Sequence, residues 1–135
     1  MAVFVAGLSI WWHRHTTKQE NTIKLLMKDL NDDLIKEGIK LLESIDNDSI
    51  DIYANSSNRH KKETVNIRNL LNYYEMVSVG ANKGIYDIKM IKQAQKTIIT
   101  KIYQHSELFI KRVRKVENNN NLYIEFETFV EKLKE

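Results

Sequence analysis

Residues 1–20 read MAVFVAGLSIWWHRHTTKQE, and the abrupt change of character within them decides the expected architecture. The first twelve residues carry no charged side chain. The next six hold four basic or titratable side chains, His13, Arg14, His15 and Lys18. Paired tryptophans followed by basic residues are typical of the cytoplasmic end of a membrane helix. We therefore expect residues 1–20 to form a membrane-anchor helix with a basic juxtamembrane segment, whose interface residues are Trp11, Trp12, Arg14 and Lys18.

The apolar run is short for a membrane span. Twelve helical residues reach about 18 Å, whereas the hydrocarbon core is about 30 Å thick. Either the chain begins upstream of Met1, or the helix inserts only partly. The alternative is a buried N-terminal helix of a soluble bundle. A secretory signal is disfavoured because the basic residues follow the apolar run instead of preceding it.

Composition extends the helical prediction to the whole chain. The 135 residues include no proline, four glycines and no cysteine, and the formal net charge is +3. Average usage is near 5% proline and 7% glycine, so breakers of regular structure are scarce. The absence of cysteine excludes disulfides, thiolate metal sites and cysteine nucleophiles. We predict an all-α protein, in which a long N-terminal helix precedes a bundle of four to five helices spanning residues 21–135.

Apolar spacing and polar interruptions place those helices. The N-terminal helix should continue to about residue 30, and Asn31, Asp32 and Asp33 should start the next one. Residues 46–58 are rich in Asp, Asn and Ser and indicate a loop with room for one short helical turn. A helix from about 60 to 79 should then end at Gly80 in a left-handed cap.

Two further helices complete the chain. Asp87 is a plausible N-cap for a helix that runs to about residue 116. Residues 118–121 are four consecutive asparagines and form the clearest loop. The expected inward positions of the last three helices are Ile67, Leu70, Leu71, Tyr74, Val77, Ile88, Ile91, Ala94, Ile98, Ile102, Phe109, Val113, Val116, Tyr123, Phe126, Phe129, Val130 and Leu133.

Several of these segments together resemble a known family. They are the N-terminal apolar-to-basic junction, RNLLNYYE at 68–75, Val79-Gly80, GIYD at 84–87, IKRVR at 110–114 and the aromatic stretch 123–129. The chain resembles the bacterial and phage single-pass proteins grouped as domain of unknown function 4760. That resemblance implies an N-terminal membrane helix and a small cytoplasmic helical domain without an established activity. A role in phage and host conflict is an analogy. The short anchor departs from the family's full span.

One helical face collects polar side chains. Arg68, Asn72 and Glu75 lie at i, i+4 and i+7, so they share one face of a helix. They could form a ligand or partner face, or a buried network in which Glu75 pairs with Arg68, Arg112 or Arg114. The candidate site residues are Arg68, Asn72, Glu75, Asp87, Arg112 and Arg114.

Catalysis and metal binding find little support in the sequence. A single carboxylate without a second acid, base or metal ligand is a poor catalyst. The four histidines do not form ligand pairs, and no phosphate-binding or nucleophile-elbow motif is present. We therefore expect no enzyme activity, no cofactor and no metal.

The basic run Lys111 to Lys115 provides an alternative function. It would let a soluble helical protein bind nucleic acid, with Tyr103 and Phe109 nearby. Residues 29–58 carry a net charge of −6, so the same run could instead face acidic segments of its own chain. We predict first a membrane-tethered interaction or sensor domain at the inner membrane, with its C-terminal domain in the cytoplasm and an unidentified protein partner.

Overall fold

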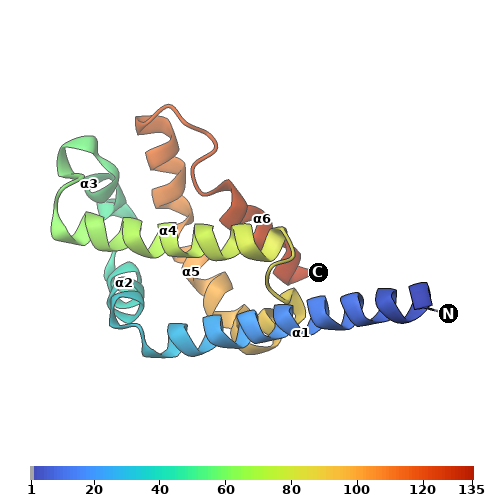
Figure 1. The fold of residues 1–135 in the computed structure, drawn as a ribbon. Helices are drawn as coiled ribbons and strands as arrows, with labels where there is room; N and C mark the ends of the chain where they lie inside the picture. The colour runs from blue at the N-terminus through green and yellow to red at the C-terminus, as the bar shows by residue number, and fades with distance from the viewer. Residues whose placement is uncertain (1) are drawn as a thin grey trace.

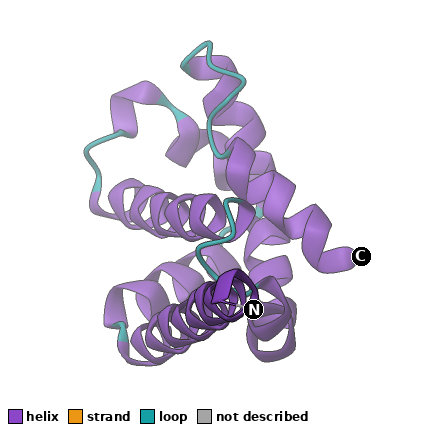
Figure 2. Ribbon diagram, turned by 45° about the vertical axis from the view of Figure 1, so that its right-hand side comes forward, coloured by secondary structure: helices purple, strands orange, loops and turns teal. Residues whose placement is uncertain are grey.

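The computed structural model describes residues 2–135, and the described chain forms helices joined by short turns and loops (Figures 1 and 2). Four helices are long: α1 (Ala2–Asn31), α2 (Asp33–Ser44), α4 (Lys62–Asn82) and α5 (Ile88–Val116). A closing helix α6 spans Ile124–Lys134. A five-residue helix α3 (Ile50–Ala54) lies between two short 3₁₀ turns, Asn47–Ser49 and Ser56–Asn58. The all-α prediction, with a long first helix and a bundle behind it, is confirmed.

Local chemistry explains the main helix starts. The Asp32 carboxylate accepts the backbone N–H groups of Leu34 and Ile35, and the Asp87 carboxylate accepts those of Lys89 and Met90. Both satisfy donors that the first turn of a helix leaves without intrahelical partners. The predicted starts of the helices at Asp32 and at Asp87 are therefore confirmed.

The bundle packs around α4 and α5. α4 contacts α2 on one side and α6 on another, and α5 crosses the molecule to reach α1, α2, α3 and α6 (Figure 1). The Tyr74 ring stacks on Phe126 with centroids 5.4 Å apart, and Tyr103 meets the same Phe126 ring edge to face at 5.4 Å. This aromatic cluster fastens α4, α5 and α6 together.

Most predicted core positions are buried, including all five on α4 and all five from Tyr123 to Leu133. Three predictions on α5 are wrong, because Ala94, Ile98 and Val116 are exposed. α5 is covered by different helices along its 29 residues, so its buried face shifts, and Ile99 is buried instead of Ile98.

Two other expectations need correction. Gly80 does not end α4 in a left-handed conformation: the helix continues to Asn82, and the glycine with positive φ is Gly84, at 76°. A residue larger than glycine does not fit at position 80, because the Tyr86 ring lies against it and its Cδ2 is only 2.7 Å from where a Cβ would stand. The segment 46–58, expected to be a loop with one short helical turn, contains the five-residue helix α3 between two 3₁₀ turns, and it buries Ile50 and Ala54.

α1 divides into two parts. Its C-terminal half packs on the bundle through Thr22, Leu25 and Asp29, which are buried. Its N-terminal part extends past the bundle (Figure 1). The seven large apolar side chains of that part are all more than half exposed: Val3, Phe4, Val5, Leu8, Ile10, Trp11 and Trp12.

Candidate functional site

Arg68 belongs to an ion cluster at the C-terminal end of α5. Its Nη2 donates to Glu117 Oε1 at 2.7 Å, and Arg59 approaches the same oxygen at 3.6 Å. The guanidinium also lies over the Phe109 ring, 6.0 Å from its centroid. Arg68 is mostly buried, so this pair joins α4 to the end of α5 in a partly desolvated setting.

Glu75 caps a helix that is remote in sequence. Its carboxylate accepts the backbone N–H of Glu125 at 3.2 Å and that of Phe126 at 2.8 Å, at the start of α6. The N-cap of α6, Tyr123, has φ 59° and supplies no side-chain hydrogen bond. Glu75 thus replaces the missing local cap, and its negative charge faces the positive end of the helix. Burial nevertheless raises the pKa of Glu75, with the two backbone N–H donors opposing that effect.

Arg114 and Arg112 find partners other than Glu75. Arg114 Nε donates to the Leu122 carbonyl at 2.9 Å, and its Nη2 donates to Glu127 Oε2 at 2.8 Å. Arg112 Nε pairs with Asp51 at 2.9 Å. The expected pairing of Glu75 with Arg68, Arg112 or Arg114 is therefore wrong for the residues that the structure describes. The polar side chains form several separate contacts in place of one network.

Asn72 and Asp87 lie apart from these contacts. Asn72 is exposed on α4, beside Asp32 and Tyr73. Asp87 caps α5, and its own backbone N–H donates to the Thr22 hydroxyl at 2.7 Å. The three residues Arg68, Asn72 and Glu75 consequently do not act as one face, although they share helical spacing.

Sequence reasoning missed the contacts that attach α1 to the bundle. Thr22 is buried, donates to the Lys18 carbonyl at 2.8 Å and accepts from Asp87. Nearby, the Tyr73 hydroxyl donates to the buried Asp29 carboxylate. Burial raises the pKa of Asp29 to about 6. The sequence offered one signal for these contacts: Thr22 and Asp29 are polar residues on the side of the helix that carries its apolar residues.

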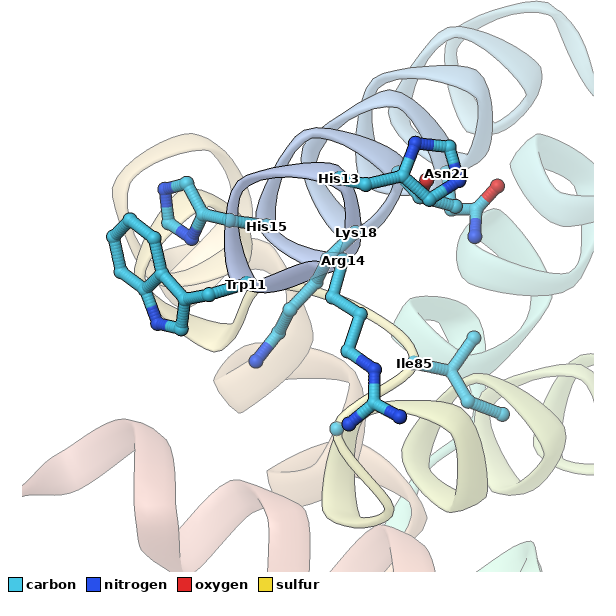
Figure 3. A pocket seen from close by; sticks show the side chains of 9 residues that line it. Trp11, His13, Arg14, His15, Lys18, Asn21 and Ile85 are labelled. Carbon is cyan, nitrogen blue, oxygen red and sulfur yellow. The ribbon is translucent and has the colours of Figure 1, made fainter. Parts of the chain in front are cut away.

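Three of the four predicted interface residues, Trp11, Arg14 and Lys18, line an open pocket of about 600 Å³ where α1 leaves the bundle (Figure 3). Arg14 and Lys18 extend from the same side of α1, where Arg14 points toward the turn that carries Ile85 and Lys18 points away from Ile85. His13 and Asn21 lie on one flank, and Trp11 and His15 on the other. The Trp11 and His15 rings stack with centroids 5.5 Å apart. Trp12 is exposed outside the pocket.

The described residues were also compared with the requirements for metal binding and for membrane crossing. In the part of the chain from Ala2 onward, no group of three histidine, cysteine or acidic side chains is placed to hold a metal ion. Over that same range, none of the helices has the length and apolar character needed to cross a membrane. The prediction of a transmembrane helix therefore gains no support from it.

Comparison with known proteins gives one match. No curated protein and no solved structure matches the sequence. A family model described as domain of unknown function (DUF4760) matches residues 1–133, which include both the apolar segment and the whole bundle. The chain therefore belongs to the DUF4760 family, as its segments from the N-terminal junction to residues 123–129 had suggested.

Proposed function

We propose that this protein is a membrane-tethered helical interaction domain, whose N-terminal apolar segment, residues 3–12, inserts partly into one leaflet of a bilayer. The observation that carries the proposal is the exposure of all seven large apolar side chains in that segment. Their burial in lipid would be favourable at roughly 25 cal/mol per Å² of apolar surface.

The distribution of these side chains favours lipid over a protein surface. At 100° per residue, the seven positions cover more than half of the circumference of α1, and small uncharged residues such as Ala6 and Ser9 fill the rest. A helix that docks on another helix needs one apolar stripe, whereas a helix in lipid is apolar all round. Ten residues rise about 15 Å, which is half of the hydrocarbon core.

The boundary of the segment agrees with an interfacial position. Trp11 and Trp12 stand at its end, and Arg14 and Lys18 follow within about 10 Å along the helix axis. Tryptophan prefers the membrane–water interface, and basic side chains prefer the cytoplasmic headgroup region. The orientation that follows places the bundle on the cytoplasmic side of the inner membrane.

The proposal can be tested by flotation with phosphatidylcholine vesicles and by tryptophan fluorescence, because both tryptophans of the chain lie in the segment. We expect the protein to float and its emission to shift to the blue. The double variant Phe4→Glu/Leu8→Glu should lose both signals, because a charge in the hydrocarbon region is costly. The matched control is Ile52→Glu/Met76→Glu, which changes two apolar residues of the bundle that are also more than half exposed.

The proposal fails if the unaltered protein does not float and its emission does not shift. In that case, sedimentation tests whether a second copy of the chain covers the apolar segment instead. Self-association that Phe4→Glu/Leu8→Glu abolishes would show that it does.

The basic run 111–115 has fewer unpaired positive charges for binding a nucleic acid than its sequence suggests. Lys111 pairs with Glu107, Arg112 with Asp51 and Arg114 with Glu127, so three of its four charges already have partners in the chain. Nucleic-acid binding stays a prediction from the sequence, and no contact of this segment favours it over the membrane proposal.

A further inference from the structure

We infer that the pocket between α1 and the α4–α5 turn binds the phosphate of an anionic phospholipid headgroup. The inference rests on the proposed membrane tethering, and it adds a lipid class and a set of ligating side chains. Its lining combines the basic side chains Arg14 and Lys18 and the polar side chains of His13, His15, Thr17 and Asn21 with the apolar residues Trp11 and Ile85 and with Gly84.

The charge of the pocket is not balanced by the protein. None of the residues that line it is acidic, and neither Arg14 nor Lys18 forms a salt bridge within residues 2–135. The two cations lie at i and i+4, so they repel each other along the helix. Figure 3 shows them on the same side of α1. A bound anion would remove that repulsion.

The donors suit a phosphate group. Arg14 can donate two parallel hydrogen bonds to two phosphate oxygens, and Lys18 provides a mobile positive charge. Asn21 lies one turn beyond Lys18 on α1, on the flank of the pocket that also holds His13, and adds an amide donor. The pocket volume, about 600 Å³, falls within the range of small-molecule sites.

Position points to a lipid as the source of the phosphate. Trp11 belongs both to the exposed apolar segment and to the pocket lining. Arg14 lies about 5 Å beyond Trp11 along the helix axis, and Lys18 about 10 Å beyond it. The headgroup layer on each side of a bilayer is about 5–8 Å deep, so a helix inserted up to its tryptophans holds Arg14 within that layer. Lys18 lies just beyond the layer, and its long side chain, which tilts toward the N-terminus of the helix, can reach back to the phosphates.

The absence of acidic lining residues also selects among headgroups. A zwitterionic headgroup brings a choline or ethanolamine cation, which would meet Arg14 and Lys18 without a carboxylate to pair with it. A headgroup with net negative charge, such as phosphoglycerol, brings no such cation. We therefore expect phosphatidylglycerol to bind better than phosphatidylcholine.

The test compares vesicles of phosphatidylcholine alone with vesicles that contain 30% phosphatidylglycerol. The unaltered protein should bind the anionic vesicles more tightly, and Arg14→Gln/Lys18→Gln should remove about 25-fold of that gain, since each basic side chain near a membrane contributes about five-fold. Binding to neutral vesicles should remain, which separates this inference from the tethering proposal. If neutral binding is absent as well, the tethering proposal itself has failed.

A matched control separates a defined site from general charge. Lys61→Gln/Lys62→Gln removes the same two charges from exposed positions at the far end of α4, about 30 Å from the turn. It should change the anionic gain by less than two-fold. Equal losses in the two double variants would overturn the inference, because they would show diffuse attraction to the whole molecule.

Nuclear magnetic resonance locates the contact with soluble ligands. Dihexanoyl-phosphatidylglycerol should shift the Arg14 Nε–H, the Asn21 amide and the Gly84 backbone signals until they saturate, whereas dihexanoyl-phosphatidylcholine should not. Inorganic phosphate is the third ligand. If phosphate saturates the same signals and the vesicles do not discriminate, the site binds a free anion and the lipid assignment is wrong. Shifts that never saturate contradict a site of either kind.

Discussion

The Glu75 carboxylate accepts a 2.8 Å hydrogen bond from the backbone N–H of Phe126, 51 residues further along the chain. This contact starts α6 from outside, and it lies directly beside the stacked rings of Tyr74 and Phe126. A helix start and an aromatic cluster are thereby held by neighbouring residues of α4.

Replacing Glu75 should uncap α6. We expect Glu75→Ala to reduce the free energy of unfolding by about 1–3 kcal/mol, because two partly buried N–H donors lose their acceptor. Glu75→Gln should cost less, since one oxygen remains. Urea unfolding followed by circular dichroism measures both changes. Asn72→Ala is the control, because Asn72 is exposed on the same helix and should change stability by no more than about 0.5 kcal/mol.

Asp29 should make stability fall as the pH rises. Burial raises the pKa of Asp29 from 3.8 to about 6 in the folded protein. Between those values the folded state holds the proton more often than the unfolded state, so the free energy of unfolding decreases with increasing pH. The decrease begins near pH 4 and is complete just above pH 6. Its size is on the order of 2 kcal/mol.

Asp29→Asn should remove this component, because asparagine does not titrate. Unfolding midpoints measured at half-unit steps from pH 4 to pH 7.5 should fall less steeply in the variant than in the unaltered protein. The raised pKa of Glu75 contributes in the same direction, so some slope will remain. Parallel slopes for the two proteins would contradict the assignment to Asp29.

Gly80 should not tolerate a side chain. A Cβ at this position meets the Tyr86 ring, and Cδ2 would lie 2.7 Å away. We expect Gly80→Ala to destabilise the protein by about 1–3 kcal/mol, although alanine favours a helix more than glycine does. Gly7→Ala is a matched control, since Gly7 has open space around it and also lies within a helix. Only the first substitution should lower the melting temperature.

The Arg68–Glu117 pair should matter more than an exposed pair. Arg68→Met leaves Glu117 with the more distant Arg59 alone and should cost about 1–3 kcal/mol. Lys111→Met breaks the exposed pair with Glu107, and its effect should stay within about 0.5 kcal/mol. A comparison of the two unfolding free energies tests this, and equal effects would show that burial adds nothing to the first pair.

The sequence predicted positions on a helix better than contacts between helices. The buried sides of α4 and α6 follow from apolar spacing, because each of these helices keeps the same buried side along its length. α5 does not, so Ala94, Ile98 and Val116 were placed wrongly. The charged residues Arg68, Glu75 and Arg114 were candidates from the sequence, and each contacts a residue of another segment. Their partners lie in segments whose positions depend on the whole fold, so spacing within one helix could not identify them.

The acidic residues after the basic run gave a signal that was not used. Glu117 and Glu127 follow Lys111 to Lys115 closely, and they accept hydrogen bonds from Arg68 and Arg114. The alternation of acidic and basic segments along the chain had indicated that they neutralise one another in the folded protein. The pairs of Arg68 with Glu117 and of Arg114 with Glu127, together with that of Arg112 and Asp51, are examples of this neutralisation. The contacts of Thr22 and Asp29 had no comparable pattern, because each is a single polar residue.

Because α1 is continuous, it fixes the rotation of the bundle relative to the N-terminal apolar segment. Thirty residues run without a break from the apolar segment to the buried Thr22 and Asp29, so a rotation at one end is passed to the other. Inserting one alanine after Thr16 would turn the bundle by about 100° relative to the tryptophans, whereas four would turn it by only about 40°. The direction in which the bundle projects from α1, relative to the tryptophans, is thus set by the number of residues between the two ends.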